Sequence, residues 1–228
     1  MTRGAEKIIV ALDVPSEKEA LQLANDLHSE VAMFKVGLQL YTAAGPGLVG
    51  GISLLSRIFL DLKLHDIPNT VGKAVESAGT RGVEMLTIHL SGGSEMIRAA
   101  TAAKGKTLIL GVTVLTSSNE QTLRESGISE GINEHVLRLA KLGVENGIDG
   151  VVASPHEIKA LRAEFGNRIK IVVPGIRPSW ATAGDQKRFM TPREAIEVGA
   201  DYLVIGRPIT AHKSPKEALE KILQEMGK

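Results

Sequence analysis

Short runs of β-branched and aliphatic residues alternate with stretches of helical periodicity along the whole chain, and this alternation limits the possible folds more than any other feature. The apolar runs predict strands at Ile8–Val14, Met33–Leu38, Ile58–Leu62, Met85–Leu90, Leu108–Leu115, Gly150–Ala153, Ile169–Pro174 and Tyr202–Gly206. The amphipathic stretches predict helices at Ser16–Leu27, Pro46–Leu55, Pro68–Thr80, Ser94–Ala103, Asn133–Asn146, His156–Phe165, Thr191–Val198 and Ser214–Met226. Because the composition does not break anywhere, a single α/β domain over residues 1–228 is expected.

Strand–helix pairs repeated in this way favour a closed barrel of parallel strands, the (β/α)₈ or TIM barrel. A doubly wound open sheet is the alternative, and it normally has a G-x-G-x-x-G turn after its first strand. Here the first strand runs into Asp13-Val14-Pro15-Ser16, which contains no glycine. The barrel is therefore the predicted fold. It would hold catalytic residues at the carboxyl ends of the strands and phosphate after strands seven and eight.

Charge and composition argue against several classes of function. Lys and Arg number 27 against 26 Asp and Glu, with no basic run, so neither a nucleic-acid partner nor a membrane surface is expected. The absence of cysteine excludes disulfides, thiolate catalysis and cysteine-bound metals. No apolar stretch approaches the ~20 residues that span a bilayer, and residues 1–7 have no apolar signal core. The expected location is the cytoplasm.

Charged residues gather where the first three predicted strands end. Because side chains alternate along a strand, Asp13, Lys35, Asp61 and Lys63 lie opposite the large aliphatic residues and are expected to point into the barrel mouth. Asp66 follows in the next loop. Any one of these charges alone is better explained as a strand end that reaches water. Four on three consecutive strands point to a site, since burying an ion costs several kcal/mol unless it is paired.

The surroundings of Lys63 indicate what kind of chemistry it performs. A lysine that forms a Schiff base must be neutral, which requires an apolar or cationic setting. Lys63 instead has carboxylates at Asp61 and Asp66. A pair of opposite unit charges ~4 Å apart is worth about 4 kcal/mol at an effective dielectric near 20, so Lys63 is expected to stay an ammonium. Such a group donates a proton or stabilises a carbanion.

Residues 59–71, Phe-Leu-Asp-Leu-Lys-Leu-His-Asp-Ile-Pro-Asn-Thr-Val, resemble the signature of bacterial orotidine 5′-monophosphate (OMP) decarboxylases. The D-x-K-x-x-D part is shared with a wider group of barrel enzymes, whereas the Ile-Pro-Asn-Thr that follows is more specific. Further matching stretches occur in the same order at 11–13, 34–37, 114–117, 174–178, 184–188 and 204–209. The resemblance thus covers essentially the whole chain, and it implies a (β/α)₈ barrel that converts OMP to UMP and CO₂ in de novo pyrimidine biosynthesis.

The resemblance also implies roles at the reacting end of the substrate. Lys63 would protonate C6 of the pyrimidine after CO₂ leaves, and Asp61 would lie beside the substrate carboxylate. Lys35 would pair with Asp61 and a ribose hydroxyl, and Asp13 would bind ribose as well. Thr116 would contact the edge of the pyrimidine ring.

Two further sets of residues follow from the same resemblance. Asp66, Ile67 and Thr70 would reach into the site of a second subunit, which makes the expected assembly a homodimer with shared active sites. The phosphate would be held by Arg177, Gln186, Gly206 and Arg207. For Gly206 and Arg207 position alone gives the same answer, since they follow the eighth strand, where glycine permits close backbone approach and arginine offers a bidentate fork.

No metal or cofactor is expected, because the six histidines are scattered and none has a recognisable zinc spacing. Two rival functions remain. A sugar-phosphate aldolase or decarboxylase of the same wider group would use a divalent metal. It would need an acidic residue near the end of strand two to bind that metal, where this chain has Lys35. A catalytically silent barrel that binds a nucleotide is the other. The sequence leaves open whether His89 supports the site or is structural.

Overall fold

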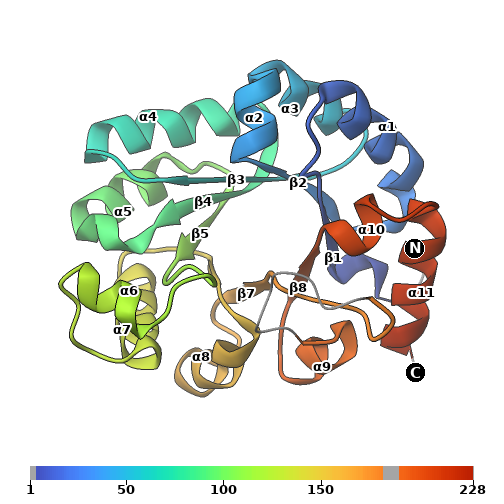
Figure 1. Ribbon diagram of the computed structural model, residues 1–228. Coiled ribbons are helices and arrows are strands. Elements are labelled where there is room, and N and C mark those ends of the chain that lie inside the picture. The colour runs from blue at the N-terminus through green and yellow to red at the C-terminus, as the bar shows by residue number, and fades with distance from the viewer. Residues whose placement is uncertain (1–3, 182–189, 228) are drawn as a thin grey trace.

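The computed structural model describes residues 4–181 and 190–227 and has the form of a closed barrel (Figure 1). Parallel strands follow one another around it in sequence order, and β8 pairs with β1 to close it. The strands are β1 (Ile8–Ala11), β2 (Met33–Gly37), β3 (Ile58–Leu64), β4 (Val83–His89), β5 (Leu108–Val112), β6 (Gly150–Val152), β7 (Lys170–Val173) and β8 (Tyr202–Ile205). The predicted (β/α)₈ barrel is confirmed, and every predicted strand overlaps an observed one.

Helices surround the barrel on its outside (Figure 1). They are α1 (Glu17–Leu27), α2 (Leu38–Ala44), α3 (Pro46–Ser53), α4 (Pro68–Gly79), α5 (Gly93–Ala103), α6 (Glu120–Glu125), α7 (Ile132–Glu145), α8 (Ile158–Phe165), α9 (Pro192–Glu197), α10 (Arg207–Thr210) and α11 (Pro215–Gly227). The sequence did not predict α2, α6 and α10. These have 7, 6 and 4 residues, which is two helical turns or fewer.

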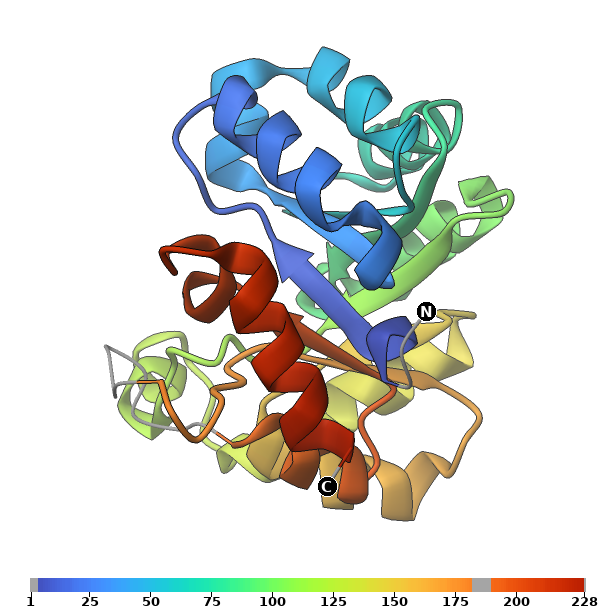
Figure 2. The same cartoon turned by 90° about the vertical axis from the view of Figure 1, so that its right-hand side faces the viewer.

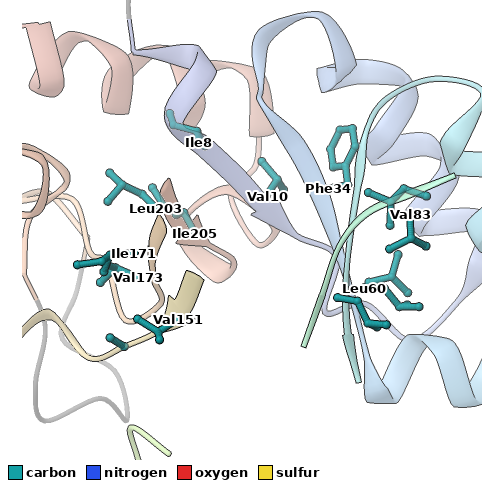
Figure 3. Close-up of a cluster of buried hydrophobic side chains, with 14 of the residues drawn as sticks. Ile8, Val10, Phe34, Leu60, Val83, Val151, Ile171, Val173, Leu203 and Ile205 are labelled. Carbon is teal, nitrogen blue, oxygen red and sulfur yellow. The ribbon is translucent and has the colours of Figure 1, made fainter. Parts of the chain in front are cut away.

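Alternation along the strands divides the apolar residues into two layers, as predicted. One layer fills the barrel interior and consists of Ile9, Ala11, Met33, Phe59, Met85, Leu110, Val172 and Val204. The other lies between the strands and the helices, and Figure 3 shows part of it, including Ile8, Val10 and Phe34. On strands one to three the charged residues follow Ile9, Met33 and Phe59 on the inner face, so they point to the mouth of the barrel.

Two aspartates join neighbouring strands at the amino-terminal end of the barrel. Asp201 directly precedes β8, and its carboxylate accepts hydrogen bonds from the Arg162 guanidinium and from the backbone N–H of Ile171 on β7 (2.7 Å). Asp149 precedes β6 in the same way and accepts from the backbone N–H of Ile109 on β5 (2.8 Å). Each carboxylate therefore ties the start of one strand to its neighbour, at the end opposite the charged cluster.

We expect Asp201→Ala to lower the free energy of unfolding by about 1–3 kcal/mol, because a half-buried N–H and guanidinium lose their acceptor. The measurement is urea unfolding at neutral pH. A matched control is Glu197→Ala, which removes an exposed pair with Arg193 (2.9 Å) and should cost only about 0.3–0.5 kcal/mol. Equal midpoints for the two variants would contradict the role given to Asp201.

Candidate active site

A cavity of about 640 Å³ opens at the carboxyl ends of β1, β2, β3, β7 and β8. Its polar lining includes Asp13, Lys35, Asp61, Arg177 and Arg207. The helix α10 lies beside the carboxyl end of β1, so the turn after β8 borders the same opening (Figure 2). The cavity therefore has acidic and basic groups from the first three strands on one side and arginines from the last two on the other.

The charged residues of the first three strands form one continuous ionic network. The Lys35 ammonium lies 2.9 Å from Asp13 Oδ1 and 3.8 Å from Asp61 Oδ2. The Lys63 ammonium donates to both oxygens of Asp61, at 2.8 and 2.9 Å. The structure thus brings together all four residues that alternation directed into the barrel mouth.

Burial distinguishes the members of this network. The side chains of Lys35 and Asp61 are 10% and 14% exposed, whereas that of Asp13 is 52% exposed. Ions removed from water to this degree are stable only when opposite charges and hydrogen bonds compensate them, and the alternating signs supply both. Asp61, between two ammonium groups, is the centre of the arrangement.

The backbone at Lys63 is unusual. Among the described residues, Lys63 is the single non-glycine residue with a positive φ, at 51°. Its N–H donates to the hydroxyl of Thr87 on β4 at 2.8 Å, and that hydroxyl in turn donates to Asp61 Oδ1 at 3.0 Å. Left-handed backbone costs a β-carbon-bearing residue energy and is found mainly at functional sites, where surrounding contacts enforce it.

Thr87 was missed by the sequence analysis. It is fully buried on β4, on the same face as Met85, which points into the barrel. Inward alternation on the fourth strand could have revealed it, because a hydroxyl in an aliphatic barrel interior needs a partner. The pattern of charged residues does not indicate Thr87, because its side chain is uncharged.

Three of the predicted phosphate residues, Arg177, Gly206 and Arg207, lie around the opposite side of the cavity. Arg207 begins α10, directly after Gly206. Arg177 is 8% exposed, and its backbone N–H donates to the carbonyl of Met190 at 3.0 Å. Gln186 lies outside the described residues.

Trp180 and His212 also line the cavity and were not predicted. Their rings meet edge to face, with centroids 5.9 Å apart. The segment that carries Trp180 is fastened to α11, since the backbone N–H of Ser179 donates to both carboxylate oxygens of Glu225 at 3.2 Å. No sequence motif marked these residues, because the contacts join segments more than thirty positions apart.

Five of the predicted site residues that the structure describes are not among those that line the cavity: Lys63, Asp66, Ile67, Thr70 and Thr116. Lys63 is joined to the lining through its ion pair with Asp61. The Asp66 side chain is exposed and accepts a hydrogen bond from the backbone N–H of Ile67 at 2.6 Å. Ile67 is 67% exposed, which is high for a large aliphatic side chain. Thr70 and Thr116 are exposed as well.

His89 lies at the end of β4, with its ring centroid 5.6 Å from that of His65. Burial lowers the pKa of the His89 imidazole below its ordinary value of 6.5, and repulsion from His65 and Lys63 lowers it further, while Asp61 opposes this shift. The neutral form is therefore favoured beside the ionic network. The structure thus places His89 next to the network.

In residues 4–181 and 190–227, no three His, Asp or Glu side chains are grouped as a metal site. The absence of a metal from the reaction nevertheless stays a prediction. Within the same part of the chain, no helix combines the length and apolarity needed to cross a membrane.

The fold and the site define a (β/α)₈ barrel enzyme whose cavity contains a lysine–aspartate network at the carboxyl ends of the strands. The chain belongs to the family described as "Orotidine 5′-phosphate decarboxylase / HUMPS family", whose model matches residues 6–222. The match spans the barrel from before β1 into α11.

Individual relatives agree with this assignment. The chain is 49% identical to an orotidine 5′-phosphate decarboxylase of Geobacter sp. (strain M21), over 99% of each chain. It is 46% identical to that of Heliobacterium modesticaldum, over 97% of this chain and 96% of the relative. A crystal structure of the Lactobacillus acidophilus enzyme superposes with a TM-score of 0.85 at 36% identity, covering 97% of this chain and 99% of the other.

We expect the His89 imidazole to titrate below 6.5, because protonation would add a cation near Lys63 and His65 in a half-buried position. In Asp61→Asn the His89 pKa should fall further, since the carboxylate that raises it is removed. NMR titration of the imidazole signals measures both values, with His89→Gln used to assign the signal. A rise of the His89 pKa in Asp61→Asn would contradict this electrostatic coupling.

Proposed function

We propose that this chain decarboxylates orotidine 5′-monophosphate to UMP and CO₂ in de novo pyrimidine biosynthesis, with neither metal nor cofactor. The observation that carries the proposal is the Lys63 ammonium, held against both oxygens of Asp61 in a network that includes Lys35 and Asp13. Family membership and relatives named as OMP decarboxylases over nearly their whole length support the choice of substrate.

The two sides of the cavity match the two ends of the proposed substrate. Arg177, Gly206 and Arg207 would bind the phosphate, with Gln186 as a further contact. On the other side Asp13 and Lys35 would hydrogen-bond the ribose hydroxyls, and Thr116 would meet the edge of the pyrimidine. Binding energy from the phosphate, far from the reacting bond, would then help to hold the pyrimidine against Lys63.

The chemistry follows from the charge on Lys63. When the bond from C6 to the carboxylate carbon breaks, its electron pair stays on C6 as a carbanion in the ring plane, and CO₂ leaves. A preorganised ammonium stabilises the negative charge that develops there, without any rearrangement of solvent. Lys63 then gives a proton to C6, which yields UMP and a neutral amine that regains its proton from water. Asp61 orients the ammonium and would lie beside the departing carboxylate.

The wild-type chain is expected to consume OMP at an undiminished rate in EDTA, and Lys63→Ala should lose most of its kcat while UMP still binds. Lys63 acts on developing charge, whereas the phosphate contacts act on ground and transition states alike. Loss of OMP absorbance gives kcat, and calorimetry gives UMP affinity.

Lys73→Ala is the matched control, because this exposed lysine pairs with Glu76 (2.9 Å) on α4, outside the cavity. Loss of activity in EDTA with recovery in magnesium or manganese would favour the metal-dependent sugar-phosphate reaction. UMP binding without turnover would favour a nucleotide-binding barrel. A near-normal kcat in Lys63→Ala would remove Lys63 from the mechanism.

The proposed active unit is a homodimer in which Asp66, Ile67 and Thr70 enter the neighbouring subunit's site. The exposure of Asp66 and Ile67, both outside the cavity of their own chain, supports this assignment. A two-fold interface of this kind is isologous, so each subunit would lend the same residues to the other. The proposed location is the cytoplasm, and the near-zero net charge of +1 supports the absence of a nucleic-acid or membrane partner.

Mixing two inactive variants tests the shared site. When Asp66→Ala and Lys63→Ala subunits exchange, each hybrid dimer contains one site with both residues intact and one that lacks both. Equal amounts make half of the dimers hybrid, so about a quarter of wild-type sites should reappear, as closed two-fold pairing requires. Activity assays before and after exchange measure this recovery. If verified hybrids regain no activity, both residues act within one chain.

A further inference from the structure

The ladder between β3 and β4 is interrupted beside the reacting lysine. Leu60 pairs with Leu86, and the next pair joins Leu64 to Ile88. Three residues of β3, Asp61 to Lys63, therefore face a single residue of β4, which is Thr87. A bulge of this kind leaves backbone groups without ladder partners and redirects the side chains within it.

The hydroxyl of Thr87 makes hydrogen bonds to two groups of the bulge, the backbone N–H of Lys63 and the carboxylate of Asp61. Because a backbone N–H can only donate, Thr87 Oγ1 is the acceptor for the N–H of Lys63, at 2.8 Å. The hydroxyl's own hydrogen is then directed to Asp61 Oδ1, at 3.0 Å, since an ionised carboxylate can only accept. The same Asp61 carboxylate holds the Lys63 ammonium at 2.8 and 2.9 Å. Backbone, hydroxyl, carboxylate and ammonium thus form a closed ring.

We propose that Thr87 is a positioning residue for decarboxylation: it fixes the left-handed backbone of Lys63 and the carboxylate of Asp61 at once, and so fixes the position of the Lys63 ammonium. The inference rests on the proposed function. Thr87 acts through the two charged residues and does not line the cavity. Its contribution is therefore to the placement of the proton donor and not to the binding of nucleotide.

The character of the threonine side chain fits this role. Thr87 is completely buried, so its hydroxyl does not exchange its partners for water. Branching at Cβ restricts its χ1 angle, which aims the hydroxyl at the bulge. Lys63 keeps a φ of 51°, a conformation that a lysine holds only where surrounding contacts enforce it. A serine at this position would keep the hydroxyl but would leave its χ1 angle less restricted. A valine would keep the branched shape but would have no hydroxyl.

This difference gives the test. Thr87→Val is expected to lower kcat at least tenfold while the dissociation constant of UMP changes less than about twofold. Thr87→Ser is expected to retain kcat within about threefold of wild type. A folded Thr87→Val enzyme with kcat near wild type would overturn the proposal, and so would a Thr87→Ser enzyme that is no more active than Thr87→Val.

Thr107→Val separates positioning from stability. Thr107 is also a buried threonine next to β4 and β5, and its hydroxyl donates to the carbonyl of Val83 at 2.8 Å, at the amino-terminal end of the barrel. Its loss should lower the melting temperature and leave kcat unchanged. A loss of kcat in Thr107→Val as large as that in Thr87→Val would assign both effects to general destabilisation and overturn the proposal.

A measurement on the wild-type chain remains decisive if Thr87→Val does not fold. The Lys63 amide should be protected from hydrogen exchange to the degree seen for amides paired within β4 and β5. Rapid exchange of the Lys63 amide would show that the hydroxyl does not hold it, and would overturn the proposal. If the wild-type chain fails to decarboxylate OMP while this amide is protected, the proposed function is wrong. The hydrogen bond by which Thr87 holds the Lys63 backbone is then still supported.

Discussion

The pairing of buried charges at the mouth of the barrel governs the organisation of this protein. Lys35 and Asp61 lie where a barrel would ordinarily hold branched aliphatic residues, and their side chains are almost out of contact with water. Such ions persist because Asp61 lies between two ammonium groups and accepts a further hydrogen bond from Thr87. Removing any partner would leave an uncompensated charge, so these residues are fixed relative to one another before substrate binds. That preorganisation is what a reaction through a carbanion requires.

The two ends of the barrel carry different kinds of contact. At the amino-terminal end, Asp149 and Asp201 tie neighbouring strands together with backbone hydrogen bonds. At the carboxyl end, β1 to β3 present the ionic network, and the turns after β7 and β8 present Arg177 and Arg207. Stabilising contacts are thus separated from reactive ones by the length of the barrel interior, and a change at one end need not disturb the other.

Backbone strain has a specific place in this arrangement. The left-handed conformation of Lys63 occurs within a bulge in which three residues of β3 face one residue of β4. Without the bulge, Lys63 would donate its N–H to the ladder and its side chain would follow the ordinary pleat. The hydroxyl of Thr87 compensates for the lost ladder bond and also orients Asp61. Local strain, a buried polar group and the Lys63 ammonium are therefore one structural unit.

The sequence by itself determined the barrel and the membership of its charged cluster. Strand periodicity sorts residues onto faces, so Asp13, Lys35, Asp61 and Lys63 could be directed to one opening without coordinates. Only the tertiary structure decided which charges pair and that Lys63 has a positive φ. It alone also showed that Thr87 contacts Asp61, that Trp180 lines the cavity, and that Glu225 holds the segment that carries Trp180. These features depend on register between strands and on contacts between distant segments. Periodicity within a single segment contains no information about either, because it describes direction and not distance.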